Sequence, residues 1–297
     1  MEPAGHIISV SRRTDVPAHY AEWFLARVRQ GFCEYVHPFS RKRFRVSLRP
    51  ADVLGIVFWS RDYRPMLPHL AALLEQYVFY CHLTLTGHGP ALEPNAMPLE
   101  TAIAAARDVA RLIGPEKLVW RFDPVVFTQL GSADDTLARM RHLAHELEGA
   151  TRHCVISHMS PYRRQARAFA ERGLTWDEPS PELRREVAAR LAEVASQHGM
   201  TLSVCCNADV VGPGVSAASC VSAHRLRSLG ALIPEGWPRG PSRASCGCDR
   251  SVDIGAYDTC PSGCAYCYAN QDHARAAAYH RAHDASWPSL VPPAEGA

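Results

Sequence analysis

The first two hundred residues alternate between short apolar runs and segments with helical spacing, and this alternation constrains the fold more than any other feature. Continuous apolar runs are typical of strands that are buried on both faces of a parallel sheet. The segments between them, some opened by proline or closed by glycine, are typical of helices. Strands are predicted at residues 6–11, 53–59, 77–86, 117–124, 154–159 and 200–205.

Helices that alternate with strands predict right-handed crossovers and a parallel sheet. They are predicted through residues 20–28 and over 66–75, 98–113, 133–147 and about 181–198. Six strands are too few for a closed eight-stranded barrel. We therefore expect an α/β protein in which residues 1–206 form a partial (β/α)6 TIM-like barrel. Residues 33–49 predict a hairpin, and its basic run at 41–43 is most simply a solvated turn.

Cysteines are concentrated near the carboxyl terminus. Eight of the eleven lie between Cys205 and Cys267, in a stretch that is rich in glycine, proline and serine and shows little periodicity. Such a segment has no apolar core of its own, so it needs crosslinks to stay folded. A bound metal is the obvious crosslink. We expect residues 207–297 to form a cysteine-rich cluster-binding segment, packed on the barrel mouth and containing a helix at 272–279.

Cys260, Cys264 and Cys267 stand at C-x3-C-x2-C spacing on a turn-rich loop. Three thiolates can hold three irons of a 4Fe–4S cube and leave the fourth iron open to another ligand. A zinc site is the alternative, although structural zinc sites usually use paired C-x2-C knuckles and only one such pair is present. Spacing alone does not separate the two.

The remaining carboxyl-terminal thiols predict a second metal site. Its candidate ligands are Cys206, Cys220, Cys246 and Cys248, with Cys205 as the alternative to Cys206. A fully ligated cube has no open iron, so its role would be electron relay or substrate ligation. Zinc is also an alternative metal for this second site.

Polar residues follow the predicted strands at their carboxyl ends, where parallel α/β barrels carry their chemistry. Arginine there can fork onto a carboxylate or phosphate, so the catalytic candidates are Arg12, Arg121 and Asp123. The structural alternative is that Asp123 simply pairs with Arg121. His82 and His158 lie within apolar runs and are expected to be core histidines.

Composition restricts the partners. Lys and Arg total 32 against 30 Asp and Glu, so the charge balance does not call for nucleic acid. The sequence shows neither a signal-peptide pattern nor an apolar run of eighteen residues, so a cytoplasmic protein without a membrane span is expected. In a reducing compartment, clustered cysteines indicate metal or catalysis.

The spacing of Cys260, Cys264 and Cys267 resembles the cluster loop of radical S-adenosylmethionine (SAM) enzymes. In those enzymes the amino and carboxylate groups of SAM chelate the open iron. By this resemblance Tyr266 matches the aromatic that packs against the adenine. The other expected cofactor-binding residues are Arg13, Ser60 and Thr84.

A wider set of motifs is similar to the DUF1848 family, over nearly the whole chain. They are residues 11–15, Phe58-Trp59, residues 121–124, Cys246-Gly247-Cys248, residues 253–257 and the C-x3-C-x2-C loop. That family is regarded as radical-SAM-like and loosely similar to spore photoproduct lyases. The resemblance implies a cluster and a partial barrel, but no substrate. Two departures are that the loop follows the sixth strand rather than the first, and that Trp59-Ser60-Arg61 stands where a Gly-Gly-Glu pattern is usual.

The expected function is a radical SAM enzyme with one or two 4Fe–4S clusters. Its expected partners are SAM, a small-molecule substrate for which the arginines favour an anion, and an electron donor such as flavodoxin or ferredoxin. Two alternatives stay open: a non-catalytic iron–sulfur protein for electron transfer or redox sensing, and a zinc-stapled module that binds nucleic acid. The balanced charge disfavours the last.

Overall fold

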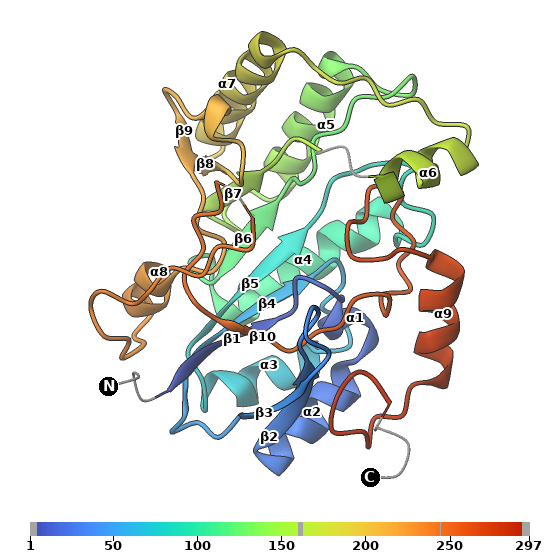
Figure 1. Cartoon of the computed structure of the whole chain (residues 1–297). Coiled ribbons are helices and arrows are strands. Elements are labelled where there is room, and N and C mark those ends of the chain that lie inside the picture. Colours follow the sequence, from blue (N-terminus) through green and yellow to red (C-terminus); the bar gives the residue numbers. More distant parts are fainter. Residues whose placement is uncertain (1–4, 160–162, 244, 293–297) are drawn as a thin grey trace.

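The structure is a computed structural model that describes residues 5–159, 163–243 and 245–292. Its centre is an eight-stranded sheet in the order β10-β1-β4-β5-β6-β7-β8-β9, in which all neighbouring strands are parallel (Figure 1). Within the described residues β9 and β10 are edge strands, so the sheet is open. The strands are β1 His6–Val10, β4 Val53–Ser60, β5 Phe79–Thr84, β6 Leu118–Arg121, β7 His153–Ile156, β8 Thr201–Val204, β9 Val215–Ala217 and β10 Val252–Asp253.

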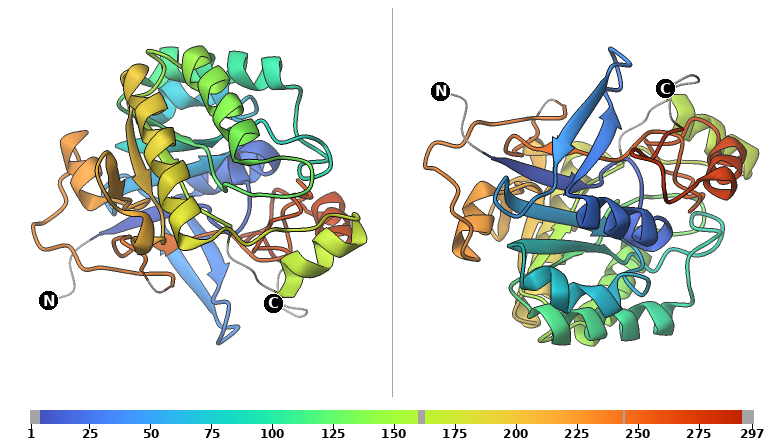
Figure 2. Two further views of the ribbon diagram at one scale, coloured as in Figure 1. Left: turned by 90° about the horizontal axis from the view of Figure 1, so that it is seen from above. Right: turned by 90° about the horizontal axis from the view of Figure 1, so that it is seen from below.

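Helices α3, α4, α5 and α7 cover one face of this sheet (Figure 2). Polar N-caps begin several helices, such as Ser132, whose hydroxyl accepts from the Asp135 backbone N–H in a capping box at the start of α5. The helices are α1 Val16–His19, α2 Ala21–Gln30, α3 Leu67–Leu74, α4 Leu99–Ile113, α5 Ala133–Glu146, α6 Arg163–Glu171, α7 Pro181–Gln197, α8 Ala223–Ser228 and α9 His273–Ala282.

The α/β class and all six predicted strands are confirmed. The prediction missed the short elements β9, β10, α6 and α8. Strands of two or three residues carry no periodicity, because they form only where a neighbouring strand offers its edge. Both β9 and β10 come from the 207–297 segment and extend the sheet formed by the first 206 residues; the division into two units stays a prediction.

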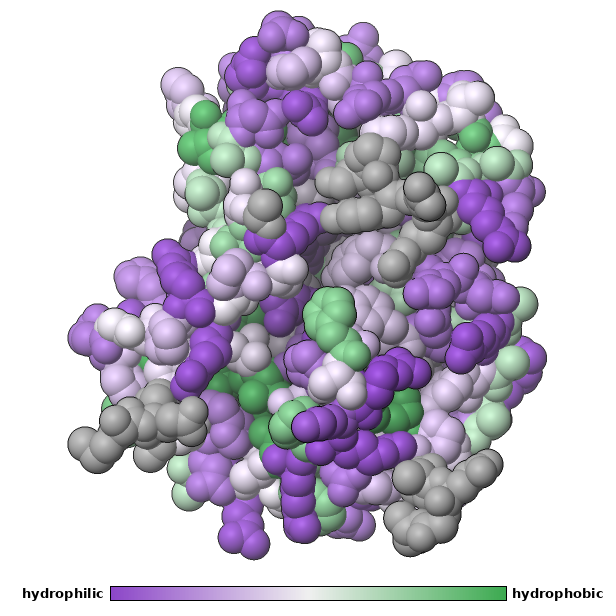
Figure 3. All heavy atoms as spheres, viewed as in Figure 1, coloured by the Kyte–Doolittle hydropathy of each residue, from purple (hydrophilic) through white to green (hydrophobic). Residues whose placement is uncertain are grey.

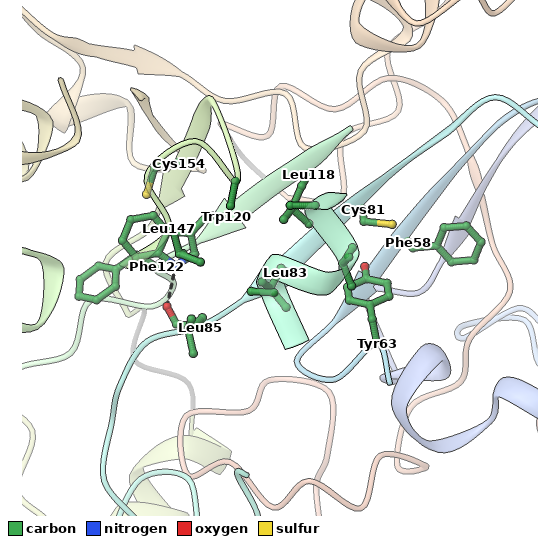
Figure 4. Packing of buried hydrophobic residues seen from close by; sticks show 14 of the residues in the cluster. Phe58, Tyr63, Cys81, Leu83, Leu85, Leu118, Trp120, Phe122, Leu147 and Cys154 are labelled. Carbon is green, nitrogen blue, oxygen red and sulfur yellow. Dashed lines mark hydrogen bonds between the residues drawn. The ribbon is translucent and has the colours of Figure 1, made fainter. Parts of the chain in front are cut away.

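The two faces of the sheet differ because strand side chains alternate. On the helix-covered face, Phe58, Cys81, Leu118 and Trp120 are fully buried in the main core (Figure 4). On the opposite face, Ile7, Val57, Tyr80, Val119 and Val155 form a second cluster with residues of the segment 220–237, including Val221 and Leu226. The space that a barrel would enclose is therefore partly filled by the carboxyl-terminal segment.

Closer to the carboxyl ends of the strands, this second face becomes polar. Strand register and alternation place Ser9, Trp59, His82 and Arg121 on the same face as the apolar residues Val57 and Val119. The chain therefore brings polar groups together where the covering segment meets the sheet.

The predicted hairpin is confirmed as β2 Phe32–Val36 paired with β3 Arg43–Ser47. It projects from the body of the molecule (Figure 2). Phe39, between its two strands, is 90% exposed. Figure 3 shows a hydrophobic spot on this otherwise mostly hydrophilic face of the molecule. Arg41 and Lys42 are exposed, as expected for a solvated turn. In the described ranges, every helix is too short or too polar to cross a membrane.

Candidate metal centres

We call the loop with Cys260, Cys264 and Cys267 the tripod loop. Side chains donate hydrogen bonds to its backbone carbonyls and to the carbonyl just before it. The Tyr20 hydroxyl donates to the Thr259 carbonyl at 2.5 Å. The Asn270 side-chain amide donates to the Cys260 carbonyl at 2.6 Å. Figure 1 shows the loop, in red, beyond the arrowheads of the strands. The loop is therefore fixed at the carboxyl edge of the sheet.

Helix α6, which the sequence analysis missed, clamps the same loop from the other side. Gln165 donates from Nε2 to the Tyr266 carbonyl at 2.8 Å. Arg172, just after α6, donates from Nη2 to the Gly263 carbonyl at 2.6 Å. Gly263 has a φ of 70°, a left-handed conformation that favours glycine and reverses the chain between the first two thiols.

The three tripod thiols are near one another but spread widely. The Cys264 thiol lies close enough to Cys260 and Cys267 to feel their charge. The three Sγ atoms do not all fall within 4.8 Å of one another. Tetrahedral zinc with Zn–S bonds of about 2.3 Å would hold its sulfurs about 3.8 Å apart. A cube spreads its ligands more widely, because each thiolate binds a different iron, and the spacing of the tripod thiols is compatible with one.

Burial raises the pKa of two of the tripod thiols, Cys260 and Cys264. Desolvation raises the pKa of Cys264 to about 12, although the nearby Arg61 guanidinium opposes the shift. Desolvation, together with the Asp15 carboxylate, raises the pKa of Cys260 as well. Because metal ligation requires thiolate, loading this site must release protons.

A cavity of about 420 Å³ lies against the tripod loop at the carboxyl ends of β4 and β5. Cys264 and Ser262 form part of its wall. The predicted cofactor-binding residue Thr84 also lines it, and Ser60 donates to Asp15, a lining residue, at 2.6 Å. The remaining charged groups of the lining are Arg61, Asp62, Arg64 and Glu93, and burial lowers the pKa of the lining histidines His19 and His88.

Tyr266 joins a buried polar network next to this cavity. Its hydroxyl donates to Glu93 and accepts from Arg61 Nη1 at 2.9 Å. Arg61 also pairs with Glu93, which accepts from Thr86 at 2.6 Å. The sequence does not indicate a role for Glu93, since a single glutamate in a proline-containing loop carries no signal. The network fixes the phenol end of Tyr266, the residue expected to pack on adenine.

The second set of thiols forms a closed ring of five. Cys205 lies 3.6 Å from Cys206 between the two sulfurs, and Cys206 contacts Cys246. Cys248 contacts both Cys246 and Cys220, and Cys220 contacts Cys205. We call this set the thiol ring. The sequence predicts either Cys205 or Cys206 as a ligand, and the structure brings both into the ring.

The ring is assembled from three separate segments, which explains why sequence alone did not fix its membership. Cys205 and Cys206 follow β8, Cys220 lies between β9 and α8, and Cys246 and Cys248 precede β10. All eleven cysteines are free of disulfides. Hydrogen bonding with Cys206 and Cys248 lowers the pKa of Cys246, whereas the pKa of each of the other four ring thiols is raised.

Arg121 lies beside the thiol ring rather than the tripod loop. It donates from Nη1 to Cys220 Sγ at 3.1 Å, and it pairs with Asp123, which also accepts from Ser157. Its guanidinium carbon is 5.2 Å from the centre of the Trp59 ring. The ion pair between Arg121 and Asp123 is therefore present, and Arg121 also donates a hydrogen bond to the Cys220 sulfur.

Arg12 connects the two thiol sets. Its backbone N–H and its Nε donate to Asp253 at 2.9 and 3.3 Å, and its charge reaches Cys248. Tyr268, next to the tripod thiol Cys267, donates to the Arg12 carbonyl at 2.6 Å. Arg12 Nη1 is buried without a hydrogen-bond partner in the described structure. An unpartnered buried donor is costly, so this atom is suited to an anionic ligand.

Asp253 is the second polar residue that the site analysis missed. It accepts from Ser9 and Ser11 as well as from Arg12, and it is 5% exposed. Its signal was present in the motif at 253–257, but no role could be read from it. Arg13, in contrast, points to Tyr257, with its guanidinium carbon 5.3 Å from the ring centre, and is not among the residues that line the cavity beside Cys264.

The two histidines expected in the core are buried. His82 is 2% exposed, its Nε2 lies 2.7 Å from the Cys220 carbonyl, and its ring stacks on Trp59 at 4.2 Å. His158 is 4% exposed. His82 therefore supports the wall of the thiol ring.

A family model described as "Domain of unknown function (DUF1848)" matches residues 7–269. The chain belongs to the DUF1848 family. No curated protein and no solved structure matches it. The DUF1848 match contains all eleven cysteines, both thiol sets and nearly the whole sheet, whereas α9 lies beyond it. The recognition made from motifs is thereby confirmed at the level of the family.

Proposed function

We propose that this DUF1848 protein is a radical SAM enzyme with a 4Fe–4S cluster on Cys260, Cys264 and Cys267. The observation that carries the proposal is that the tripod loop brings three thiols near one another, with one of them, Cys264, in the wall of a cavity of about 420 Å³. Three ligands leave one iron of a cube open. When bound, such a cluster supplies the electron that cleaves SAM into methionine and a 5′-deoxyadenosyl radical.

The cavity beside Cys264 is where we expect SAM to bind. Its charged walls contain carboxylates, at Asp15 and Glu93, and a guanidinium, at Arg61. These are the partners that the amino group and the carboxylate of a zwitterion need. Ser60 and Thr84 flank the same space, and Tyr266 stands next to it. Arg13 is the one predicted cofactor-binding residue that this assignment leaves aside.

The thiol ring is assigned to a second, fully ligated cluster. Five thiols are one more than a cube requires, so the neighbours Cys205 and Cys206 need not both be ligands. With all irons ligated by protein, this cluster fits electron relay rather than SAM binding. Arg121 would hold a thiolate of the ring by a charge-assisted hydrogen bond.

The substrate is proposed to be a small anion that binds between the two thiol sets. Arg12 offers its unpartnered Nη1 there, with Tyr268 on the tripod side and Cys248 on the ring side. In this proposal the sheet acts as a partial barrel, and the segment 220–237 shields its inner face from water. An electron donor such as flavodoxin or ferredoxin supplies the electron for the cleavage.

The proposal is tested by anaerobic reconstitution followed by dithionite and SAM. The intact protein should produce 5′-deoxyadenosine, and Cys264→Ser should abolish production because it removes a tripod ligand. Cys33→Ala is the matched control, since Cys33 is buried in the main core away from both thiol sets and should retain activity. A protein with a full complement of iron and sulfide but without 5′-deoxyadenosine would contradict the proposal.

Zinc in the thiol ring is the second candidate, and one distance favours it. The 3.6 Å between the sulfurs of Cys205 and Cys206 is close to the separation of about 3.8 Å that tetrahedral zinc imposes. The chain would then be a zinc-stapled protein with a single iron–sulfur site. Metal analysis after anaerobic purification decides this, because about one zinc per chain beside about four irons would assign the ring to zinc.

A further inference from the structure

Two histidines and a glutamate meet where helices α5 and α7 end, on the helix-covered side of the sheet and apart from both thiol sets. His145 lies in the last turn of α5, Glu148 just after it, and His198 is the C-cap of α7. One ligand atom from each of the three lies within 4.8 Å of the other two. Within the described residues this is the one group of three or more such ligand atoms that is so close.

The contacts show that the group is already partly assembled. His198 Nδ1 lies 2.9 Å from Glu148 Oε2. The centres of the His145 and His198 rings are 5.9 Å apart, with the rings edge to face. His198 is half-buried, and His145 and Glu148 are exposed, so the group is open to ions from solvent.

The ends of the helices favour a cation at this position. The last carbonyl groups of an α-helix carry a partial negative charge, and two helices end here. Imidazole nitrogen with one carboxylate oxygen is a ligand set that suits zinc and nickel, and three protein ligands leave a position for water. Bonds of about 2.1 Å would place the ligand atoms about 3.4 Å apart, which requires only a small closure from the present spacing.

We propose that His145, Glu148 and His198 form a surface site for a divalent transition-metal ion such as Zn²⁺, which ties α5 to α7. These two helices pack against each other, and His198 stands three residues before β8, the strand that leads directly into Cys205 and Cys206. The bound ion fixes the chain at the start of that strand. It acts as a clamp and is independent of the iron–sulfur assignment.

Nickel titration of the anaerobically reconstituted protein tests the site, because imidazole ligands suit Ni²⁺ and the thiol sites are already loaded. Calorimetry should show one binding event per chain outside those sites. His198→Ala and His145→Ala should each weaken that event at least tenfold, because each removes a direct ligand. Nickel should also raise the thermal midpoint of the intact protein and have much less effect on either variant.

His142→Ala is the matched control. His142 is an exposed histidine on the same helix, one turn earlier, and does not belong to the group. This variant should bind nickel as the intact protein does, and iron content measured on every sample should show that the thiol sites are unchanged. Equal nickel affinity in all four proteins, or a loss in His142→Ala as large as in His198→Ala, would overturn the proposal.

Discussion

The Asp253 carboxylate shows how one residue joins segments that are distant in sequence. It lies on β10, yet its hydrogen-bond donors Ser9, Ser11 and Arg12 all belong to β1 or to the residues just after it. Replacing a buried partner of this kind leaves the opposite charge unpaired, which costs about 3–5 kcal/mol. Asp253 therefore holds the cysteine-rich segment against the first strand.

Asp253 predicts a loss of stability in acid. Burial alone would raise its pKa, but the charges of Arg12 and Arg13 outweigh burial and hold the pKa below the usual value. The carboxylate therefore contributes stability above about pH 4, the value in the unfolded chain, and this is lost as the pH falls through the folded pKa. In urea unfolding, Asp253→Asn should be about 3 kcal/mol less stable at pH 7.

The same variant should lose less stability than the intact protein between pH 4 and the folded pKa, because the titrating group is gone. Unfolding of the metal-free protein across that range measures the difference. An identical dependence on pH in the two proteins would show that Asp253 is not the group responsible.

Single residues also show where sequence was sufficient. The tripod loop was recognised because C-x3-C-x2-C lies within eight residues, so its spacing is visible without the fold. Glu93 was missed because its partners Arg61 and Tyr266 lie 32 and 173 residues away. Such a contact is created by the sheet and leaves no local trace in the sequence.

Among the elements, β10 is the least predictable and among the most consequential. Only two residues long, it pairs with β1 at Ser9 and thereby sets the path from Cys248 toward the tripod loop. The long amphipathic helices, by contrast, were predicted within a few residues because their apolar positions repeat every turn. The sequence therefore predicts the long helices and the main strands well. It predicts poorly the short strands that connect the thiol segments to the sheet.

Gly255, two residues after β10, should not tolerate a side chain. A Cβ at this position would lie 2.6 Å from Ser11 Cβ, inside the contact between the cysteine-rich segment and β1. We expect Gly255→Ala to destabilise the protein by about 1–3 kcal/mol through overpacking. Gly212→Ala is the control, since no atom lies within 4 Å of its added Cβ. Thermal unfolding of both variants measures the difference, and equal midpoints would refute the close contact.

At the scale of the whole molecule, one open sheet supports two sulfur sites. The tripod loop lies beyond the carboxyl ends of β4 and β5, and the thiol ring lies near the ends of β6 and β8. Arg12 and Tyr268 lie between them. The sequence predicted that thiols would gather at this edge, but the five-membered ring depends on how three segments cross and could only be seen in the fold.

Iron content should report the two sites separately. If each holds a cube, reconstituted protein should contain about eight irons per chain. A variant with Cys260, Cys264 and Cys267 all changed to serine should retain about four, and a variant with Cys220, Cys246 and Cys248 changed to serine should also retain about four. Loss of all iron in either variant would mean that the sites do not assemble independently.

The most direct test of the open iron is electron–nuclear double resonance on the reduced protein with SAM labelled with ¹⁷O in its carboxylate. The Cys220→Ser, Cys246→Ser, Cys248→Ser variant should be used, so that only the cluster on the tripod loop contributes. Because three thiolates leave one iron free, we expect hyperfine coupling between the cluster and the label. A spectrum that labelled SAM leaves unchanged, with the cluster intact, would contradict the account.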